Sequence, residues 1–166
     1  LPCIVAGISE VFVGQYYGQK RFDQIGSCVW QMIWFALFCT PLFIFLAYLT
    51  PSFVFKGVLN VGLVKEYYVP FLSFGAIFAL NPALMGFFIG RGKVRVITLV
   101  SLLGNIFNIF LDYSLIYGYG PIPSLGVKGA AYATIISQLM MALCFLALFL
   151  RKKNKNLFHT HAFEIQ

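Results

Sequence analysis

The sequence predicts an all-α integral membrane protein, a polytopic bundle of about five transmembrane helices. Of its 166 residues 60% are hydrophobic and only 10% are charged, whereas a soluble domain carries about a quarter charged residues. The apolar residues fall in long blocks without charge, at 28–49, 67–90, 96–111 and 129–150. Because a helix needs about 20 apolar residues to cross a bilayer core, each block is long enough for one span if 96–111 is extended to Tyr117.

A further apolar stretch, from Leu1 to Tyr17, is interrupted only by Glu10 and predicts a shorter first span. The chain begins inside this stretch and lacks the basic start of a signal peptide, so we expect its first residue to be a cut within a larger protein. A processed mature end is the alternative. The cysteines all lie in apolar blocks without a CxxC pair, which indicates neither a disulfide framework nor a metal site.

The net charge of +7 is concentrated in three clusters. Nine of the 12 Lys and Arg residues fall at 20–21, 91–95 and 151–155, and two spans separate each cluster from the next. All three clusters are therefore expected on one side of the membrane. Since cytoplasmic loops are enriched in Lys and Arg, we assign this side to the cytoplasm of a multi-pass plasma-membrane protein. No basic surface interleaved with aromatic residues remains for a nucleic acid.

The connections between spans divide the chain into a bundle and a tail. On the side opposite the basic clusters the connections contain helix breakers, as in Gly118–Gly126. Residues 1–150 are expected to form one transmembrane bundle, followed by 151–166 as a basic, polar and flexible cytoplasmic tail. His159 and His161 form an HxH pair in this tail, which we interpret as part of a solvated segment because no further metal ligands are near.

The span at 96–117 carries a stripe of polar residues. Steps of 3, 4, 3 and 4 separate its members, which places them within an arc of about 80° on a helix. They are Thr98, Ser101, Asn105, Asn108 and Asp112. Such a face is expected to point to a neighbouring helix or a water-filled cavity rather than to lipid.

Asp112 is the residue of this stripe that most needs an explanation. A carboxylate within a membrane is costly, and residues of this kind mark ion or proton pathways. Asn108 lies one turn away and can hydrogen-bond either protonation state, because an amide both donates and accepts. The alternative is that the stripe holds helices together and that Asp112 lies near the outer interface.

Three further features lie in the other spans. Glu10 is expected either to line the same cavity or to reach the cytoplasmic interface. Asn81-Pro82, midway through the third span, predicts a bend, because proline frees a backbone carbonyl. In the last span, Thr134 and Gln138 place polar groups on one face of the helix.

Small residues four apart open the last span and predict close helix packing. The pairs are Gly126 with Ala130, and Gly129 with Ala133.

Three motifs resemble the multidrug and toxic compound extrusion (MATE) transporters. Val13–Gly18 (VGQYYG) resembles their second helix, Gly104–Gly118 (GNIFNIFLDYSLIYG) their fifth, and Leu125–Gln138 (LGVKGAAYATIISQ) the start of their sixth. The resemblance implies a twelve-helix transporter of two lobes. The chain then corresponds to the N-terminal lobe from within helix two through helix six, and helix one and the C-terminal lobe are missing.

The resemblance also implies a function and a site. The family exports organic cations and other amphipathic drugs in exchange for protons or sodium, without a further cofactor. By motif position, its N-lobe cation site falls on Asn108, Asp112 and Thr134, with sodium, if it is the coupling ion, bound at Asp112. Glu10 is not part of that pattern, and Ser101, Asn105 and Gln138 are expected to line the cavity.

Multidrug export has two alternatives. A lipid-linked oligosaccharide flippase of the same superfamily needs a basic cavity for pyrophosphate, and the charge-free cores of the spans contain no Arg or Lys. A non-transporting membrane scaffold is the other alternative. We do not expect an enzyme or an ATP-driven pump, because the sequence contains no GxSxG, P-loop or HExxH motif.

Overall fold

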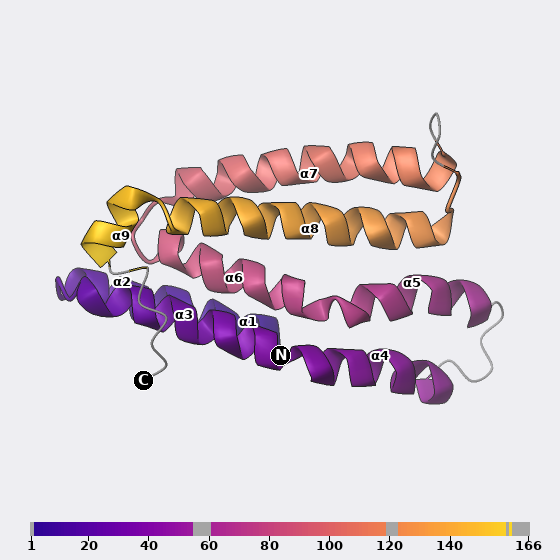
Figure 1. Ribbon diagram of the computed structural model, residues 1–166, viewed down its shortest axis with the longest axis horizontal. Helices are drawn as coiled ribbons and strands as arrows, with labels where there is room; N and C mark the ends of the chain where they lie inside the picture. The colour runs from indigo at the N-terminus through magenta and orange to yellow at the C-terminus, as the bar shows by residue number, and fades with distance from the viewer. Residues whose placement is uncertain (1, 55–60, 119–122, 159, 161–166) are drawn as a thin grey trace.

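The computed structural model describes residues 2–54, 61–118, 123–158 and 160, and these form a bundle of helices running along its long axis (Figure 1). This part of the chain contains no strand. In chain order the helices are α1 Pro2–Gly7, α2 Ser9–Gly18, α3 Asp23–Phe38, α4 Thr40–Val54, α5 Val61–Ser73, α6 Gly75–Ile89, α7 Val94–Tyr117, α8 Val127–Phe149 and α9 Lys152–Phe158.

The four full spans predicted from hydropathy are present. Three continuous segments are long and apolar enough to cross a membrane: Asp23–Pro51, Val94–Tyr117 and Val127–Phe149. A fourth consists of Val64–Ser73 and Gly75–Ile89, which meet at an angle of 45°. Helices α1 and α2 form the shorter first segment, so the prediction of an all-helical polytopic membrane bundle is confirmed.

The sharp bend in the third span is at Phe74, upstream of the predicted bend at Asn81-Pro82. Helix α6 runs unbroken through Pro82 and is held there against α8 by a side-chain contact of Asn81. The bend has a local cause further upstream. Pro70 supplies no N–H to the helix, and the Ser73 hydroxyl donates to the carbonyl of Val69 at 2.7 Å.

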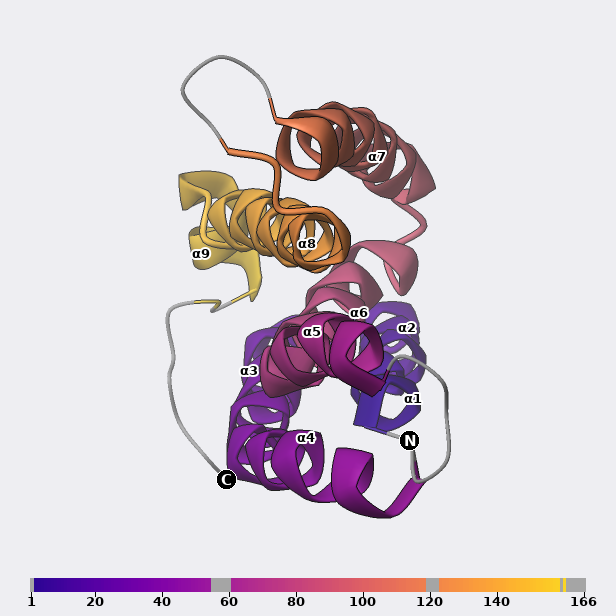
Figure 2. The same cartoon turned by 90° about the vertical axis from the view of Figure 1, so that its right-hand side faces the viewer.

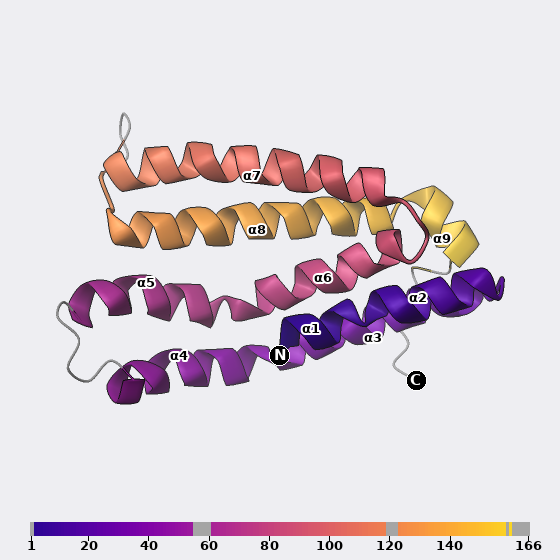
Figure 3. The same ribbon diagram turned by 180° about the vertical axis from the view of Figure 1, so that it is seen from behind.

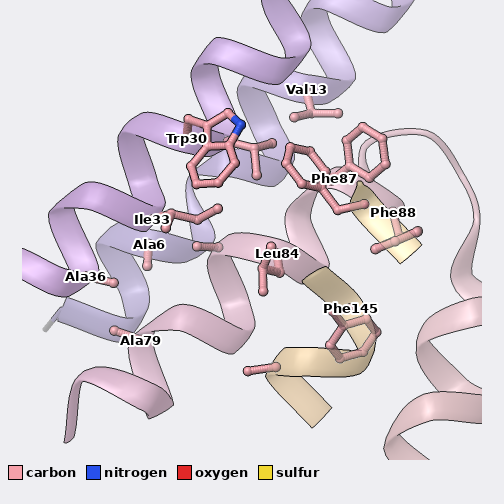
Figure 4. Close-up of a cluster of buried hydrophobic side chains, with 14 of the residues drawn as sticks. Ala6, Val13, Trp30, Ile33, Ala36, Ala79, Leu84, Phe87, Phe88 and Phe145 are labelled. Carbon is pink, nitrogen blue, oxygen red and sulfur yellow. The ribbon is translucent and has the colours of Figure 1, made fainter. Parts of the chain in front are cut away.

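Helix α6 is the centre of the bundle. It packs against α1, α2 and α3 on one side and against α8 on the other (Figure 2). Its Leu84 and Phe87 are completely buried (Figure 4). The Phe87 ring meets the Phe149 ring of α8 edge-on, with centroids 4.8 Å apart. Because lipid is as apolar as these side chains, the stabilisation comes from close packing rather than from transfer out of water.

The backbones of α2 and α6 touch where α6 has glycines. A Cβ on Gly86 would overlap the Ser9 hydroxyl oxygen and lie 2.7 Å from the amide nitrogen of Glu10. A Cβ on Gly90 would lie 2.7 Å from the carbonyl oxygen of Glu10. The Ser9 hydroxyl donates to the carbonyl of Ala83 at 3.1 Å, so a hydrogen bond reinforces this crossing.

Helices α7 and α8 form an antiparallel hairpin. A Cβ on Gly129 would lie 2.5 Å from the carbonyl oxygen of Leu115, which confirms the predicted close packing there. The prediction is wrong for Gly126, which faces open space and instead adopts φ +55° at the start of α8. Glycine is needed there for its backbone conformation.

The turns that carry the basic clusters lie together at one end of the bundle, which we call the basic end (Figures 1 and 3). It comprises the α2–α3 turn, the α6–α7 turn, Arg151 and α9. Lys128 and Glu66 form an ion pair of 3.1 Å at the opposite end. The prediction that the three clusters share one side of the bundle is thus confirmed.

The tail after α8 differs from the flexible segment that we expected. Residues 152–158 form α9, and the buried Phe158 ring contacts the rings of Phe22 and Phe87 with centroids 5.7 Å away in both cases. The Trp30 indole N–H donates to the carbonyl of Thr160 at 2.8 Å. Ring contacts and hydrogen bonds therefore both join this segment to the bundle. His159 and His161 lie outside the described residues.

Candidate functional site

A cavity of about 430 Å³ lies between α6, α7 and α8. Its polar lining comes from all three helices: Asn81 from α6, Ser101 and Asn105 from α7, and Gln138 from α8. The rest of its lining is apolar or aromatic and consists of Phe78, Pro82, Met85, Met141 and Phe145. A volume of this size, with apolar walls and a few convergent polar groups, is typical of a small-molecule site.

One amide pair joins α6 to α8 at the cavity. The Asn81 side-chain nitrogen donates to the Gln138 side-chain oxygen at 2.7 Å and to the Gln138 backbone carbonyl at 3.1 Å. The Oδ1 atom of Asn81 is buried and has no hydrogen-bond partner among the described residues. Sequence reasoning found Gln138 but treated Asn81 only as a neighbour of Pro82. A polar residue in the middle of a charge-free span was the signal that could have identified it.

The polar stripe lies on one continuous helix, α7, and its middle part faces this cavity. Ser101 and Asn105 are in its lining. Thr98 is separate from them: its hydroxyl donates to the carbonyl of Val94 at 3.2 Å, and it borders a hollow with Arg95 near the basic end. The stripe thus extends from the cavity to the basic end along one helix.

Asn108, Asp112 and Thr134 lie further from the basic end than this cavity. In the α7–α8 hairpin, Gly104 meets Met141. The two helices are antiparallel and rise equally per residue. Asn108 of α7 is therefore level with residue 137 of α8. Asp112, one turn further along α7, is level with residue 133, which directly precedes Thr134. The three predicted cation-site residues therefore share about one helical turn in height.

Their side chains differ in surroundings. The Asn108 Nδ2 atom is buried and has no acceptor in the described part of the chain. Asp112 is partly buried, and the hydroxyl of Thr134 donates to the carbonyl of Ala130 at 3.0 Å. Asn108 therefore offers an unused N–H donor at the level of the carboxylate, which suits a carboxylate or an ordered water.

Glu10 lies apart from this group. It belongs to α2, on the opposite side of α6 from the cavity, and its side chain is exposed. The neighbouring Ser9 takes the position that faces α6, and Glu10 points about 100° further round the helix. It is absent from the lining of the cavity between α6, α7 and α8.

Comparison with known proteins identifies the family. The model of the MatE family matches residues 6–114. The chain belongs to the MatE family. Two relatives, each described as a probable multidrug resistance protein NorM, come from Thermotoga maritima and Geobacillus kaustophilus. The first is 33% identical over 141 residues, covering 81% of this chain and 30% of the relative. The second is 30% identical over 148 residues, covering 87% of this chain and 32% of the relative.

The fold agrees with this family. An inward-facing multidrug resistance MATE family transporter of the MOP superfamily superposes with a TM-score of 0.79 at 24% identity, covering 92% of this chain and 35% of that one. A MATE structure in the bent conformation gives a TM-score of 0.76 at 27% identity, covering 92% and 34%. The chain thus spans about a third of the length of its MatE relatives.

Proposed function

We propose that this chain forms most of the N-terminal lobe of a secondary transporter that exports cationic or amphipathic small molecules by antiport with protons or sodium. Membership of the MatE family supports the general class. The cavity between α6, α7 and α8 is the single observation that carries the proposal within this chain. The remaining length of the relatives would supply the second lobe that alternating access requires.

The lining of the cavity fits the proposed substrates. Its aromatic and methionine side chains can pack against flat or flexible apolar groups of several shapes. Its polar groups are neutral amides and a hydroxyl, and no Arg or Lys is present among the lining residues that the structure describes. A lipid-linked pyrophosphate would need such cations, so this lining favours an amphipathic drug over a flippase substrate.

The coupling step would take place one to two turns beyond the cavity, at Asp112. A bound proton or sodium ion neutralises this carboxylate. The neutralisation changes the relative stability of the inward-facing and outward-facing states only if the two states solvate the charge differently. The unused N–H of Asn108 would stabilise the charged form, and Thr134 lies at the same height on α8. Cation and drug would then act on the same pair of helices, α7 and α8.

The orientation also belongs to this proposal. The basic end would face the cytoplasm, because Lys and Arg are enriched in cytoplasmic loops. The α4–α5 and α7–α8 connections would then face the outside.

The test is ion-driven efflux of a fluorescent cationic dye from vesicles containing the complete transporter, with and without Asp112→Asn. Proton and sodium gradients are imposed separately. Asp23→Asn is the matched control, because it makes the same chemical change at an exposed residue in the first turn of α3. We expect Asp112→Asn to abolish coupled efflux under the driving gradient and Asp23→Asn to leave it intact.

Three results would contradict parts of the proposal. Unchanged efflux with Asp112→Asn would move the coupling carboxylate elsewhere. Equal losses in both variants would show an effect on folding or insertion. No efflux under either gradient in the unmodified protein would favour a scaffold.

A further inference from the structure

At the basic end, a second and smaller hollow lies where α6, α7, α8 and α9 meet. Its volume is about 140 Å³, below the roughly 300 Å³ at which drug-sized pockets begin. Arg91, Lys93, Arg151 and Asn154 form its polar side. Its other walls are apolar side chains from the ends of α6, α7 and α8. None of the described residues in this lining is a carboxylate.

Arg91 is held in one position in this hollow. Its guanidinium carbon lies 4.4 Å from the ring centroid of Phe87 and 3.9 Å from that of Phe158, so the cation lies between two aromatic faces. One terminal nitrogen donates to the Asn154 side-chain oxygen at 3.4 Å. Its Nε atom is buried without a partner in the part of the chain that the structure describes. The flat donor group is therefore fixed in place before any ligand binds.

The backbone of the α6–α7 turn fixes the neighbouring cations. The Gly92 N–H donates to the carbonyl of Ile89 and the Lys93 N–H to that of Phe88, both at 2.8 Å, with Gly92 at φ +69°. This is the pattern of a Schellman motif, which uses up carbonyls at the end of α6. Helix α7 begins directly afterwards, and its N-cap residue Lys93 makes no side-chain cap hydrogen bond. The positive end of the α7 dipole is thus near the hollow.

Among the described residues, no ion pair joins Arg91 to an acidic side chain. Burial lowers the pKa of the Arg91 guanidinium, and the neighbouring Tyr17 phenol raises it. The group still stays protonated, because an arginine side chain does not lose its proton in proteins. The ion pair found in the described residues, Lys128 with Glu66, is at the other end of the bundle. A partly buried cation without a counter-charge is costly, and an external anion would remove that cost.

We propose that this hollow binds a phosphate group, with Arg91 as its planar donor and Lys93 and Arg151 as flanking cations. An arginine fork suits phosphate oxygens, and the ammonium group of Lys93 in the same turn and the guanidinium group of Arg151 after α8 complete the charge. Because the hollow is at a membrane boundary and has apolar walls, the headgroup of an anionic phospholipid is the source that it fits best. Free inorganic phosphate shares the chemistry. The bound group would join the α6–α7 turn to the start of α9.

The experiment uses the full-length protein that contains this chain, purified in detergent, without substrate or gradient, so that its result does not depend on transport. Native mass spectrometry counts bound phosphatidylglycerol against phosphatidylcholine at equal concentrations. The variants are Arg151→Gln and Lys93→Gln, which leave the packed Arg91 in place. Arg95→Gln is the matched control, because this exposed cation of the same turn borders a different hollow.

We expect phosphatidylglycerol to be retained over phosphatidylcholine, and each of the two variants to bind it about tenfold more weakly, which corresponds to the loss of one charge-assisted contact. Arg95→Gln should bind it like the unmodified protein. A second arm measures the melting temperature with inorganic phosphate against chloride at constant ionic strength. If inorganic phosphate raises the melting temperature of the unmodified protein but not that of either variant, the hollow binds free phosphate. That result would keep the proposal of a phosphate site.

Two outcomes would overturn the proposal. One is phosphatidylglycerol retention that falls equally with Arg95→Gln, which would show attraction to net charge alone. The other is retention that neither Arg151→Gln nor Lys93→Gln changes, together with no stabilisation by inorganic phosphate. A variant that loses binding but melts at the same temperature as the control separates loss of the site from loss of the fold.

Discussion

Replacing Gly86 by alanine tests the closest packing in the bundle. The new Cβ would overlap the Ser9 hydroxyl and lie 2.7 Å from the amide nitrogen of Glu10. Ser9 can rotate away only by giving up its hydrogen bond to the carbonyl of Ala83. The Glu10 backbone cannot rotate, so α2 has to move away from α6.

The cost follows from these two terms. Overpacking a well-packed contact costs about 1–3 kcal/mol, and a lost hydrogen bond adds about 0.5–1.5 kcal/mol. We therefore expect Gly86→Ala to lower the free energy of unfolding by about 2–4 kcal/mol. Unfolding by SDS in mixed micelles, followed by the fluorescence of Trp30 and Trp34, measures this change.

The same crossing provides a control. A Cβ on Gly14 would lie 3.7 Å from the carbonyl oxygen of Gly90, an ordinary van der Waals contact. Gly14→Ala should therefore be neutral or slightly stabilising, since alanine favours a helix over glycine by up to about 1 kcal/mol. If Gly86→Ala proved as stable as Gly14→Ala, α2 and α6 would not cross as closely as described, and the argument from backbone contact would fail.

Two other contacts give predictions of different size. Asn81→Leu should lower the free energy of unfolding by about 1 kcal/mol, because hydrogen bonds between membrane helices contribute about 0.6 kcal/mol each. The same SDS titration should find no further loss when Gln138→Leu is added, and additive losses would refute the pairing. Phe158→Ala should release α9 from Arg91 and raise the rate of trypsin cleavage at Lys152 at least about tenfold, a local opening energy of about 1.4 kcal/mol. Leu157→Ala is the matched control because that neighbour is 48% exposed, and equal cleavage of both variants would show that Phe158 does not hold α9.

Features that depend on local pattern were predictable from the sequence. The spans follow from unbroken apolar blocks, and the common end of the basic turns follows from counting spans between them. The steps of 3 and 4 predict that the polar residues of α7 share one face of the helix, and Ser101 and Asn105 both line the cavity. For the cation site itself, Asn108, Asp112 and Thr134, the residue roles stay a prediction that the efflux experiment tests.

Features that depend on distant contacts were not predictable. The docking of α9 rests on Phe158 meeting Phe22 and Phe87, residues far apart in the sequence. Asn81 binds Gln138 of α8, which is 57 residues away in the sequence.

Helix α6 shows why hydropathy alone could not orient the bundle. Both of its faces are apolar, so hydropathy does not distinguish the side toward α2 from the side toward α7 and α8. Residue size does distinguish them. Small residues separated by steps of 3, 4, 3 and 4 occupy one side of the helix: Ala76, Ala79, Ala83, Gly86 and Gly90.

This side meets the first helices of the chain, and the larger or polar residues face the other way. Asn81 and Met85 line the central cavity, and Phe88 and the Arg91 that follows α6 line the hollow at the basic end. The spacing of the small residues along α6 therefore decides which side of the helix packs tightly against α2. The opposite side, with its larger residues, packs less tightly and lines the two candidate binding sites. A shift by one residue would exchange glycine for phenylalanine at the crossing with α2, where a backbone amide leaves no space even for a methyl group.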